Sequence, residues 1–285
     1  MIKVMKITVA KNAGFCFGVK RAIDIARVSS KKKEPVYMLG DIVHNENVVR
    51  DIESAGIKKI KNISRIQSGS SLLIRAHGSA RKTIEKADSL GLEVIDATCP
   101  MVKEIHKVAR DMDEKGYRIA VIGDYNHDEV QGIVGQIQHK AIVLENIADI
   151  EKKISPNLKK LAVVVQSTQN LEKVLKMQGI LKKRVPDLEF HNTICSPTRL
   201  KQDEIKTLPK KNDCIVVIGS KTSANTKRLY EIAKSINRNS YWVKSSADIK
   251  KDWFKGVESV GITAGASTPD KTIQEVKEYI QKITA

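Results

Sequence analysis

The stretch LEVIDATCPMVKEIHKVA, residues 92–109, places a cysteine at the point where a strand ends and a helix begins. The run LEVID has the apolar character of a short buried strand. Pro100 directly follows Cys99 and suits the first turn of a helix, where a missing N–H is tolerated. Apolar residues then recur on one helical face: Val102, Ile105 and Ala109. The sequence therefore predicts a strand, a cysteine and a helix in succession.

Two other segments repeat this arrangement, GFCFGVKRAIDIA around Cys16 and TICSPTRLKQDEI around Cys195. Each follows a strand-like run, and each carries a basic residue four positions after its cysteine, as Lys103 does after Cys99. The fourth cysteine, Cys214, opens the apolar run CIVVI and is expected to be a small core residue. No two cysteines form a CxxC pair, which argues against a zinc ribbon or a thioredoxin-like motif.

The repeat continues downstream of each cysteine. A count of 28 residues from each one reaches His44, His127 and Ser223, each after an apolar run and a glycine. A third layer follows in LLIRAHGSARKTI, LAVVVQSTQNLEKV and SVGITAGASTPDKTI, where an apolar run ends in small polar residues before a helix. We interpret the pattern as three copies of an α/β unit of roughly 90 residues. The predicted units are 1–98, 99–194 and 195–285.

Alternating strands and helices predict parallel sheets with right-handed crossovers. Ligands of such sheets bind at the carboxyl ends of the strands, and the repeated residues all fall there. We therefore expect three similar α/β domains with parallel sheets, in a pseudo-three-fold arrangement that brings the three cysteines together. The pattern leaves open whether the strand before each cysteine pairs within its own unit or within the preceding one.

The three cysteines suggest a metal cluster at the centre. A helix N-terminus favours the thiolate, and three thiolates without paired histidines suit an iron–sulfur cluster. A cubane has four irons, so three cysteines would leave one iron open to substrate. A nucleophilic cysteine would explain one thiol but not three. Each cysteine taken singly is also typical of a core residue, and the shared placement is what favours the cluster.

Polar residues of the second and third layers are expected around the same centre. His44 and His77 are suited to donating to phosphate oxygens, and Gly78 lets backbone approach closely. Hydroxyl and amide donors at predicted helix starts form an anion-binding arrangement: Ser167, Thr168, Ser223, Asn225 and Ser267. Any one of these donors is also an ordinary helix cap, so the prediction rests on the set.

The remaining histidines and one glutamate complete the candidates. Glu129 lies two residues after His127 and is the acidic group near the proposed centre, although a glutamate in a first helical turn is often only favoured by the helix dipole. The histidines outside the repeat are assigned to surface or core: His106, His139 and His191.

Composition narrows the class of partner. The chain of 285 residues carries 50 Lys+Arg against 33 Asp+Glu, a net charge of +17, which favours an anionic partner. Aromatic residues make up 4%, too few for a platform that stacks nucleic-acid bases. No apolar run approaches the roughly 20 residues that span a bilayer, and lysines interrupt the N-terminal stretch as they would not in a signal peptide. We expect a cytoplasmic protein with reduced thiols and no membrane or nucleic-acid partner.

Two other functions are alternatives to an iron–sulfur enzyme. A zinc hydrolase would use His44, His77, His127 and Glu129, but it would leave the cysteines without a role. A nucleic-acid-binding protein would rest on the net charge alone and would bind with a steep salt dependence. A brown colour after anaerobic purification, with iron and sulfide present, would count against both.

With these motifs in place, the sequence resembles the LytB family of 4-hydroxy-3-methylbut-2-enyl diphosphate reductases, which act last in the non-mevalonate isoprenoid pathway. The resemblance covers essentially the whole chain and rests on GFCFGV, IVHN, RAHG, DATCP, TICSPT and TAGAS, in the family's order and spacing. It implies three α/β domains around a central 4Fe–4S cluster held by three cysteines, which match Cys16, Cys99 and Cys195.

The resemblance also implies the other roles. The substrate's diphosphate is bound by residues that match His44, His77, His127, Ser167, Thr168, Ser223, Asn225 and Ser267. The family's proton-delivering glutamate matches Glu129, which we expect to act through a hydroxyl or a phosphate oxygen. The implied reaction is reductive dehydroxylation of the allylic alcohol to isopentenyl and dimethylallyl diphosphate. The two electrons arrive singly from a donor protein such as ferredoxin or flavodoxin.

The chain departs from the family's pattern at three places. The family often has HPEV, whereas this chain has Asp128 in place of the proline. It often has two threonines where this chain has Ser167 and Thr168, and some members have a serine at the position of Ala224. These departures bear on the binding of the diphosphate and leave the cysteines untouched.

Overall fold

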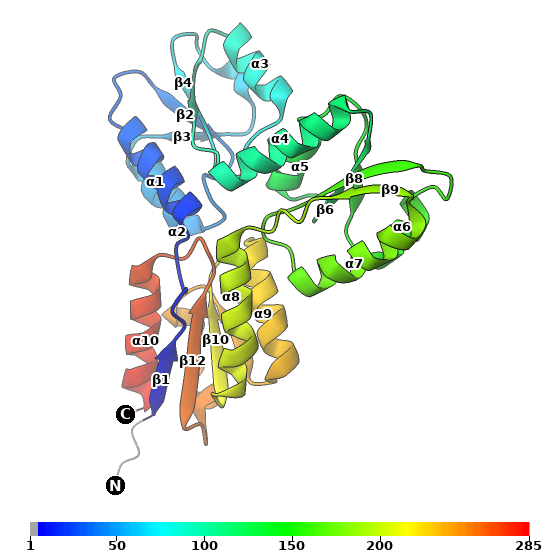
Figure 1. Cartoon of the computed structure of the whole chain (residues 1–285). Helices are drawn as coiled ribbons and strands as arrows, with labels where there is room; N and C mark the ends of the chain where they lie inside the picture. Colours follow the sequence, from blue (N-terminus) through cyan, green and yellow to red (C-terminus); the bar gives the residue numbers. More distant parts are fainter. Residues whose placement is uncertain (1–4, 285) are drawn as a thin grey trace. The chain divides into compact units, whose positions relative to one another are not determined.

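The computed structural model describes residues 5–284, so the first four residues of the first predicted unit and the last residue of the third lie outside it. The described strands form three four-stranded sheets, in which every pairing is parallel (Figure 1). The predicted α/β class with three parallel sheets is therefore confirmed. None of the helices among these residues combines the length and the apolar character that crossing a bilayer requires.

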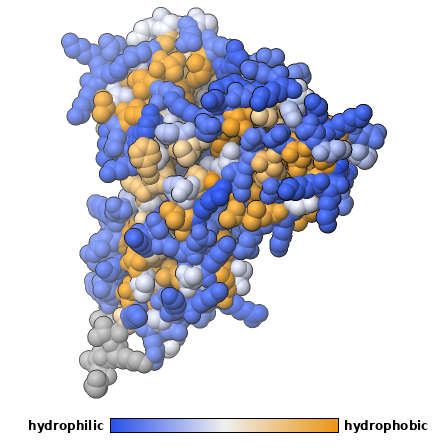
Figure 2. Space-filling view, viewed as in Figure 1, coloured by the Kyte–Doolittle hydropathy of each residue, from blue (hydrophilic) through white to orange (hydrophobic). Residues whose placement is uncertain are grey.

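The chain divides into two compact units. One contains the described residues up to Val19, the segment His44–Val48 and the chain from Ser196 onward, and it holds one sheet. The other contains Lys20–Val43 and Val49–Cys195, and it holds the other two sheets. The face drawn in Figure 2 is mostly hydrophilic with hydrophobic residues interspersed, as a chain with 29% charged residues would produce.

The sheet of the first unit has the order β1-β12-β10-β11. In Figure 1, β1 lies alongside β12, although the two are far apart in the sequence. Alternation along β10 places Cys214 and Val216 in the core with α10, whereas Ile215 and Val217 pack with α8 and α9. Helices therefore cover both faces of this sheet, as parallel sheets require. The elements are β1 (Lys6–Val9), α8 (Ser196–Thr207), β10 (Cys214–Ile218), α9 (Ala224–Ile236), β11 (Ser240–Val243), β12 (Ser259–Ala264) and α10 (Asp270–Thr284).

The first sheet of the second unit has the order β3-β2-β4-β5. Its central strand β4 is buried along its whole length, and its cluster of buried residues includes Leu72, Ile74 and Ala87. The helices α1 and α2 begin within or beside the segments assigned to the first unit. The elements are α1 (Phe17–Ser29), β2 (Val36–Leu39), α2 (Glu46–Ser54), β3 (Lys58–Ile60), β4 (Ser71–Ile74), α3 (Arg81–Ser89) and β5 (Glu93–Asp96).

The second sheet of this unit has the order β7-β6-β8-β9. Val121 and Val164 pack with α4 and α5 on one face, and Ile122 and Val163 pack with α6 and α7 on the other. The elements are α4 (Pro100–Glu114), β6 (Arg118–Ile122), α5 (Asp128–Val134), β7 (Ile142–Leu144), α6 (Ile147–Lys153), β8 (Lys160–Val165), α7 (Leu171–Arg184) and β9 (Asp187–Phe190). Short 3₁₀ turns connect elements elsewhere: Ile63–Arg65, Leu208–Lys210, Ser246–Asp248 and Lys251–Phe254.

Strand pairing answers the question that the sequence left open. The strand before Cys99, β5, pairs with β4 of the preceding repeat, and β9, before Cys195, pairs with β8 of its preceding repeat. The strand before Cys16, β1, pairs with β12 at the far end of the chain. Helix α4, which follows Cys99, contacts β6 and β8 of the next sheet. Cys99 therefore lies at the crossing from one sheet to the next.

Candidate functional site

Each of the three repeated cysteines directly precedes a helix, as predicted. Cys99 occupies the N-cap position of α4, and Cys16 and Cys195 come immediately before α1 and α8. All three side chains are partly exposed, whereas Cys214 is fully buried. The burial of Cys214 confirms its assignment to the core, and it also raises the pKa of the thiol to about 12.

One backbone hydrogen bond recurs at all three cysteines and links each cysteine to the third layer of the preceding repeat, with the third repeat preceding the first. The N–H of Cys99 donates to the carbonyl oxygen of Ala76 at 3.0 Å, that of Cys195 to Ser167 at 3.1 Å, and that of Cys16 to Ala266 at 3.2 Å. The acceptors occupy equivalent positions, each one residue before a predicted phosphate ligand: His77, Thr168 and Ser267. Each thiol is therefore held beside a third-layer residue by the same contact.

Glu129 lies in the second unit on the first turn of α5, and its side chain is only 1% exposed. Both carboxyl oxygens accept hydrogen bonds from Ser167, one from the N–H at 2.6 Å and one from the hydroxyl at 2.8 Å. Burial raises the pKa of Glu129 to about 7, against the lowering effect of these two bonds. A carboxyl group with this pKa can hold and release a proton at neutral pH.

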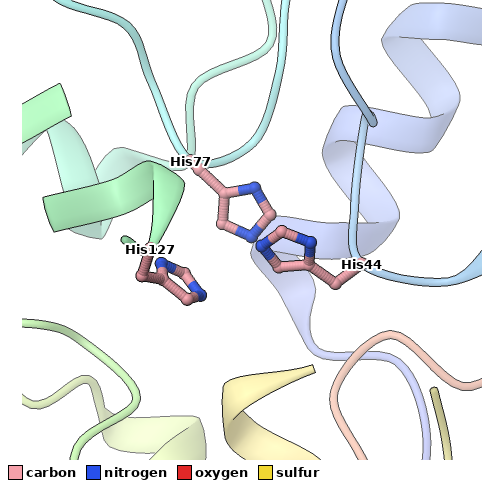
Figure 3. A group of neighbouring side chains, drawn as sticks. All are labelled: His44, His77 and His127. Atoms are coloured by element: carbon pink, nitrogen blue, oxygen red, sulfur yellow. The ribbon is translucent and has the colours of Figure 1, made fainter. Parts of the chain in front are cut away.

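His127 caps α5, and its Nδ1 accepts a hydrogen bond from the N–H of Glu129 at 3.1 Å. This contact assigns the proton of the neutral ring to Nε2, which can then act as a donor. Figure 3 draws His77, on the loop after β4, and His127, at the start of α5. The two ring centroids are 5.4 Å apart at an interplanar angle of 88°. The figure also draws His44, which belongs to the first unit.

Gly78 explains how the His77 loop turns. Its φ of +76° lies in the left-handed region, and a Cβ there would meet the His106 ring at 2.6 Å. His106 itself is buried, and burial lowers its pKa to about 4, so it is a neutral core residue as predicted. His139 is exposed and paired with Asp113, and His191 is partly buried beside β9.

The first unit gathers a second set of predicted ligands. The side-chain oxygen of Asn225 accepts a hydrogen bond from the N–H of Ala266 at 3.0 Å. Its NH₂ group is buried and has no partner among residues 5–284. The Ser267 hydroxyl donates to the carbonyl oxygen of His44 at 2.9 Å. Ser223 caps α9 by accepting from the N–H of Thr226. A buried amide donor that is held in place but unsatisfied is suited to an anionic ligand.

Sequence reasoning missed several supporting side chains of the second unit. Arg75, two residues before His77, forms an ion pair with Asp128 at 2.6 Å and so ties the His77 loop to the start of α5. Gln166 is fully buried, accepts from the N–H of Asp124 at 2.9 Å and donates to the Thr168 hydroxyl at 3.1 Å. The available sequence signal was the opposite charge of Arg75 in RAHG and of Asp128 directly after His127.

Comparison with known proteins shows extensive similarity. A family model described as LytB protein matches residues 7–281. The 4-hydroxy-3-methylbut-2-enyl diphosphate reductase of Geobacter sp. (strain M21) is 40% identical over 98% of both chains. A solved structure of (E)-4-hydroxy-3-methyl-but-2-enyl diphosphate reductase, the terminal enzyme of the non-mevalonate pathway, is 38% identical, covers 98% of this chain and 99% of its own, and superimposes with a TM-score of 0.71. The Plasmodium falciparum reductase structure is 30% identical, covers 96% of this chain and 87% of its own, and has a TM-score of 0.91.

Proposed function

The chain belongs to the LytB family, and from this premise we propose that it reduces (E)-4-hydroxy-3-methylbut-2-enyl diphosphate to isopentenyl diphosphate and dimethylallyl diphosphate. This is the last step of the non-mevalonate isoprenoid pathway. The single observation that carries the proposal is the hydrogen bond repeated at the backbone N–H of Cys16, Cys99 and Cys195. It gives these three cysteines the same setting and separates them from Cys214.

The three repeated cysteines fit the metal site that this reaction needs. Their thiols are partly exposed at helix starts, where a thiolate is favoured, and no pairing with histidine is required for iron–sulfur ligation. Cys16, Cys99 and Cys195 would hold a 4Fe–4S cluster, which supplies single electrons and a Lewis-acidic iron. A cluster held by cysteine thiolates that are not in disulfides also favours the reducing cytoplasm as the compartment.

We assign binding of the substrate's diphosphate to histidine side chains and to neutral hydroxyl and amide donors. In the second unit these are His77, His127 and the hydroxyls of Ser167 and Thr168. In the first unit they are His44, Ser223, Asn225 and Ser267, and the unsatisfied NH₂ group of Asn225 supports the assignment most directly. Such donors hold the substrate's charged end and orient its hydroxyl-bearing carbon.

Glu129 is the proposed proton source. Reduction of the C–OH bond consumes two electrons and two protons, and it yields a C–H bond and one water molecule. The Ser167 hydroxyl, 2.8 Å from Glu129, is placed to pass a proton outward from the buried carboxyl. The pKa of about 7 keeps that proton available at neutral pH. The electrons come from a one-electron carrier protein of the ferredoxin or flavodoxin class.

Anaerobic purification followed by iron and sulfide analysis tests the proposal. Serine in place of Cys16, Cys99 or Cys195 should reduce the iron content and abolish turnover with reduced methyl viologen. The matched control, Cys214→Ser, should retain iron at some cost in packing. Equal iron loss in all four variants would contradict the assignment, and stoichiometric zinc without sulfide would favour the hydrolase instead.

A further inference from the structure

A groove in the first unit brings apolar, cationic and thiol groups together at the surface. It has a volume of about 280 Å³ and is lined by the chain between β1 and α1 and by the first turns of α8. Phe17 and Leu200 stand at this groove with 71% and 49% of their surface exposed. Exposed large apolar side chains clustered beside a groove are typical of a surface that another protein covers.

The groove is rigid, because its two walls are tied together. The buried ammonium of Lys201, on α8, donates to the carbonyl oxygen of Gly14 at 2.8 Å and also to that of Asn12. The N–H of Asn12 in turn donates to the carboxylate of Glu204, also on α8, at 2.9 Å. A partner therefore meets a preformed surface, and binding requires little ordering of the chain.

The charge of the groove selects the partner. Among its lining residues the ionisable groups are Lys11, Lys201 and the thiol of Cys16, and none is a carboxylic acid. Lys11 is exposed, and the whole chain carries a net charge of +17. Such a surface attracts an acidic protein and disfavours a basic one.

The position of Cys16 identifies the partner's task, and here the inference rests on the proposed function. Cys16 lines the groove and is one of the three proposed cluster ligands. An electron carrier seated on Phe17 and Leu200 would place its own redox centre next to the thiolate that leads to the cluster. We propose that this groove is the docking site of a small acidic iron–sulfur carrier of the ferredoxin class. Each docking event delivers one electron and oxidises one carrier, so two events supply the two electrons that cleave the C–O bond.

A matched pair of leucines tests the site. Leu200 is the fifth residue of α8, Leu175 is the fifth residue of α7, and both are 49% exposed. In the cluster-loaded enzyme, Leu200→Glu should raise the Kd and the KM for reduced [2Fe–2S] ferredoxin by about tenfold or more, the scale of an interface hot spot. Turnover with reduced methyl viologen, which needs no docking surface, should stay within about twofold of wild type. Leu175→Glu should change neither.

A second variant keeps the test independent of folding at α8. Lys11→Glu reverses an exposed charge at the groove, so it should weaken ferredoxin binding and flatten its salt dependence. Binding is measured with oxidised ferredoxin as well, so the result does not depend on turnover. The docking proposal is overturned if Leu200→Glu and Lys11→Glu bind ferredoxin as tightly as Leu175→Glu. Absence of turnover with methyl viologen in the wild-type holoenzyme would instead overturn the proposed function.

Discussion

Glu129 in the second unit and Asn225 in the first occupy the same position in the repeat, thirty residues after a cysteine, but differ in chemistry. Each lies on the first turn of a helix whose cap is the residue two positions before it, His127 or Ser223. Each is buried, and each is held by a loop whose carbonyl oxygen also accepts from the cysteine amide of the next repeat: Glu129 is held by Ser167, and Asn225 by Ala266. The same framework therefore presents a buried carboxyl group of raised pKa in one unit and a buried neutral amide donor in the other.

The remaining repeat shows what burial contributes. Glu46 stands at the same position after Cys16, but it is exposed. There the cap moves by one residue, because Asn45 accepts hydrogen bonds from the N–H groups of Asn47 and Val48, and α2 begins at Glu46 itself. A glutamate at this position of the repeat is therefore not sufficient for a raised pKa. The placement of the helix start, and the burial that follows from it, raises the pKa.

The substitution Glu129→Gln tests most directly whether the buried glutamate differs in function from the exposed one. The amide keeps the shape and hydrogen bonding of the carboxyl but cannot relay a proton, so turnover should fall by about two to four decades. Iron content and substrate affinity should remain near those of wild type. The matched control, Glu46→Gln, should leave all three unchanged, since Glu46 is exposed. Near-native turnover in Glu129→Gln with the cluster intact would eliminate Glu129 as the proton source.

The burial of Glu129 should also appear in the pH dependence of stability. Its pKa rises from 4.5 to about 7 on folding, so between these values the folded chain binds a proton that the unfolded chain releases. The stabilisation is complete below the lower value and is lost as the pH rises through 7, amounting to about 3 kcal/mol by linkage. Urea unfolding of wild type at about pH 5 and about pH 8 should show this decline, whereas Glu129→Gln should show less of it. An identical decline in both proteins would place the cause elsewhere.

Asn225→Ala tests the other side of the comparison. It removes the buried NH₂ group that has no partner in the described chain, and with it the charge-assisted hydrogen bond that we propose it makes to the diphosphate. Substrate affinity should fall by about one to two decades, or about 1.5–3 kcal/mol, while the cluster's spectrum stays intact. Isothermal titration with substrate measures the loss. Unchanged affinity would remove Asn225 from the site.

The smallest expected effect concerns the ion pair that ties the second unit's site together. Arg75 and Asp128 join the His77 loop to the start of α5, and their side chains are 19% and 32% exposed. The position equivalent to Asp128 in the first unit is Ala224, which cannot form such a pair. A double-mutant cycle of Arg75→Met and Asp128→Asn should give a coupling of about 0.5–1 kcal/mol in unfolding free energy, reduced at high salt. A coupling of zero would mean that the loop is held by packing alone.

Much of the molecule was predictable because repetition is a property of the sequence itself. Three cysteines recur before helices, and a step of 28 residues leads from each to His44, His127 or Ser223. This repeat predicted three α/β units with parallel sheets, and it distinguished Cys16, Cys99 and Cys195 from Cys214. These signals are local: a strand, a cap and a helix follow from the period of apolar residues and from the chemistry of the first turn.

Only the tertiary structure decided which strands pair and which side chains are buried. β1 pairs with β12 across almost the full length of the chain, and such a pairing depends on contacts that no local pattern specifies. Glu46 and Glu129 are the same residue at the same repeat position, yet only one is enclosed by protein and acquires a pKa near neutrality. Burial is set by everything that packs around a side chain, so the raised pKa of Glu129 and the unsatisfied amide of Asn225 arise only in the folded chain.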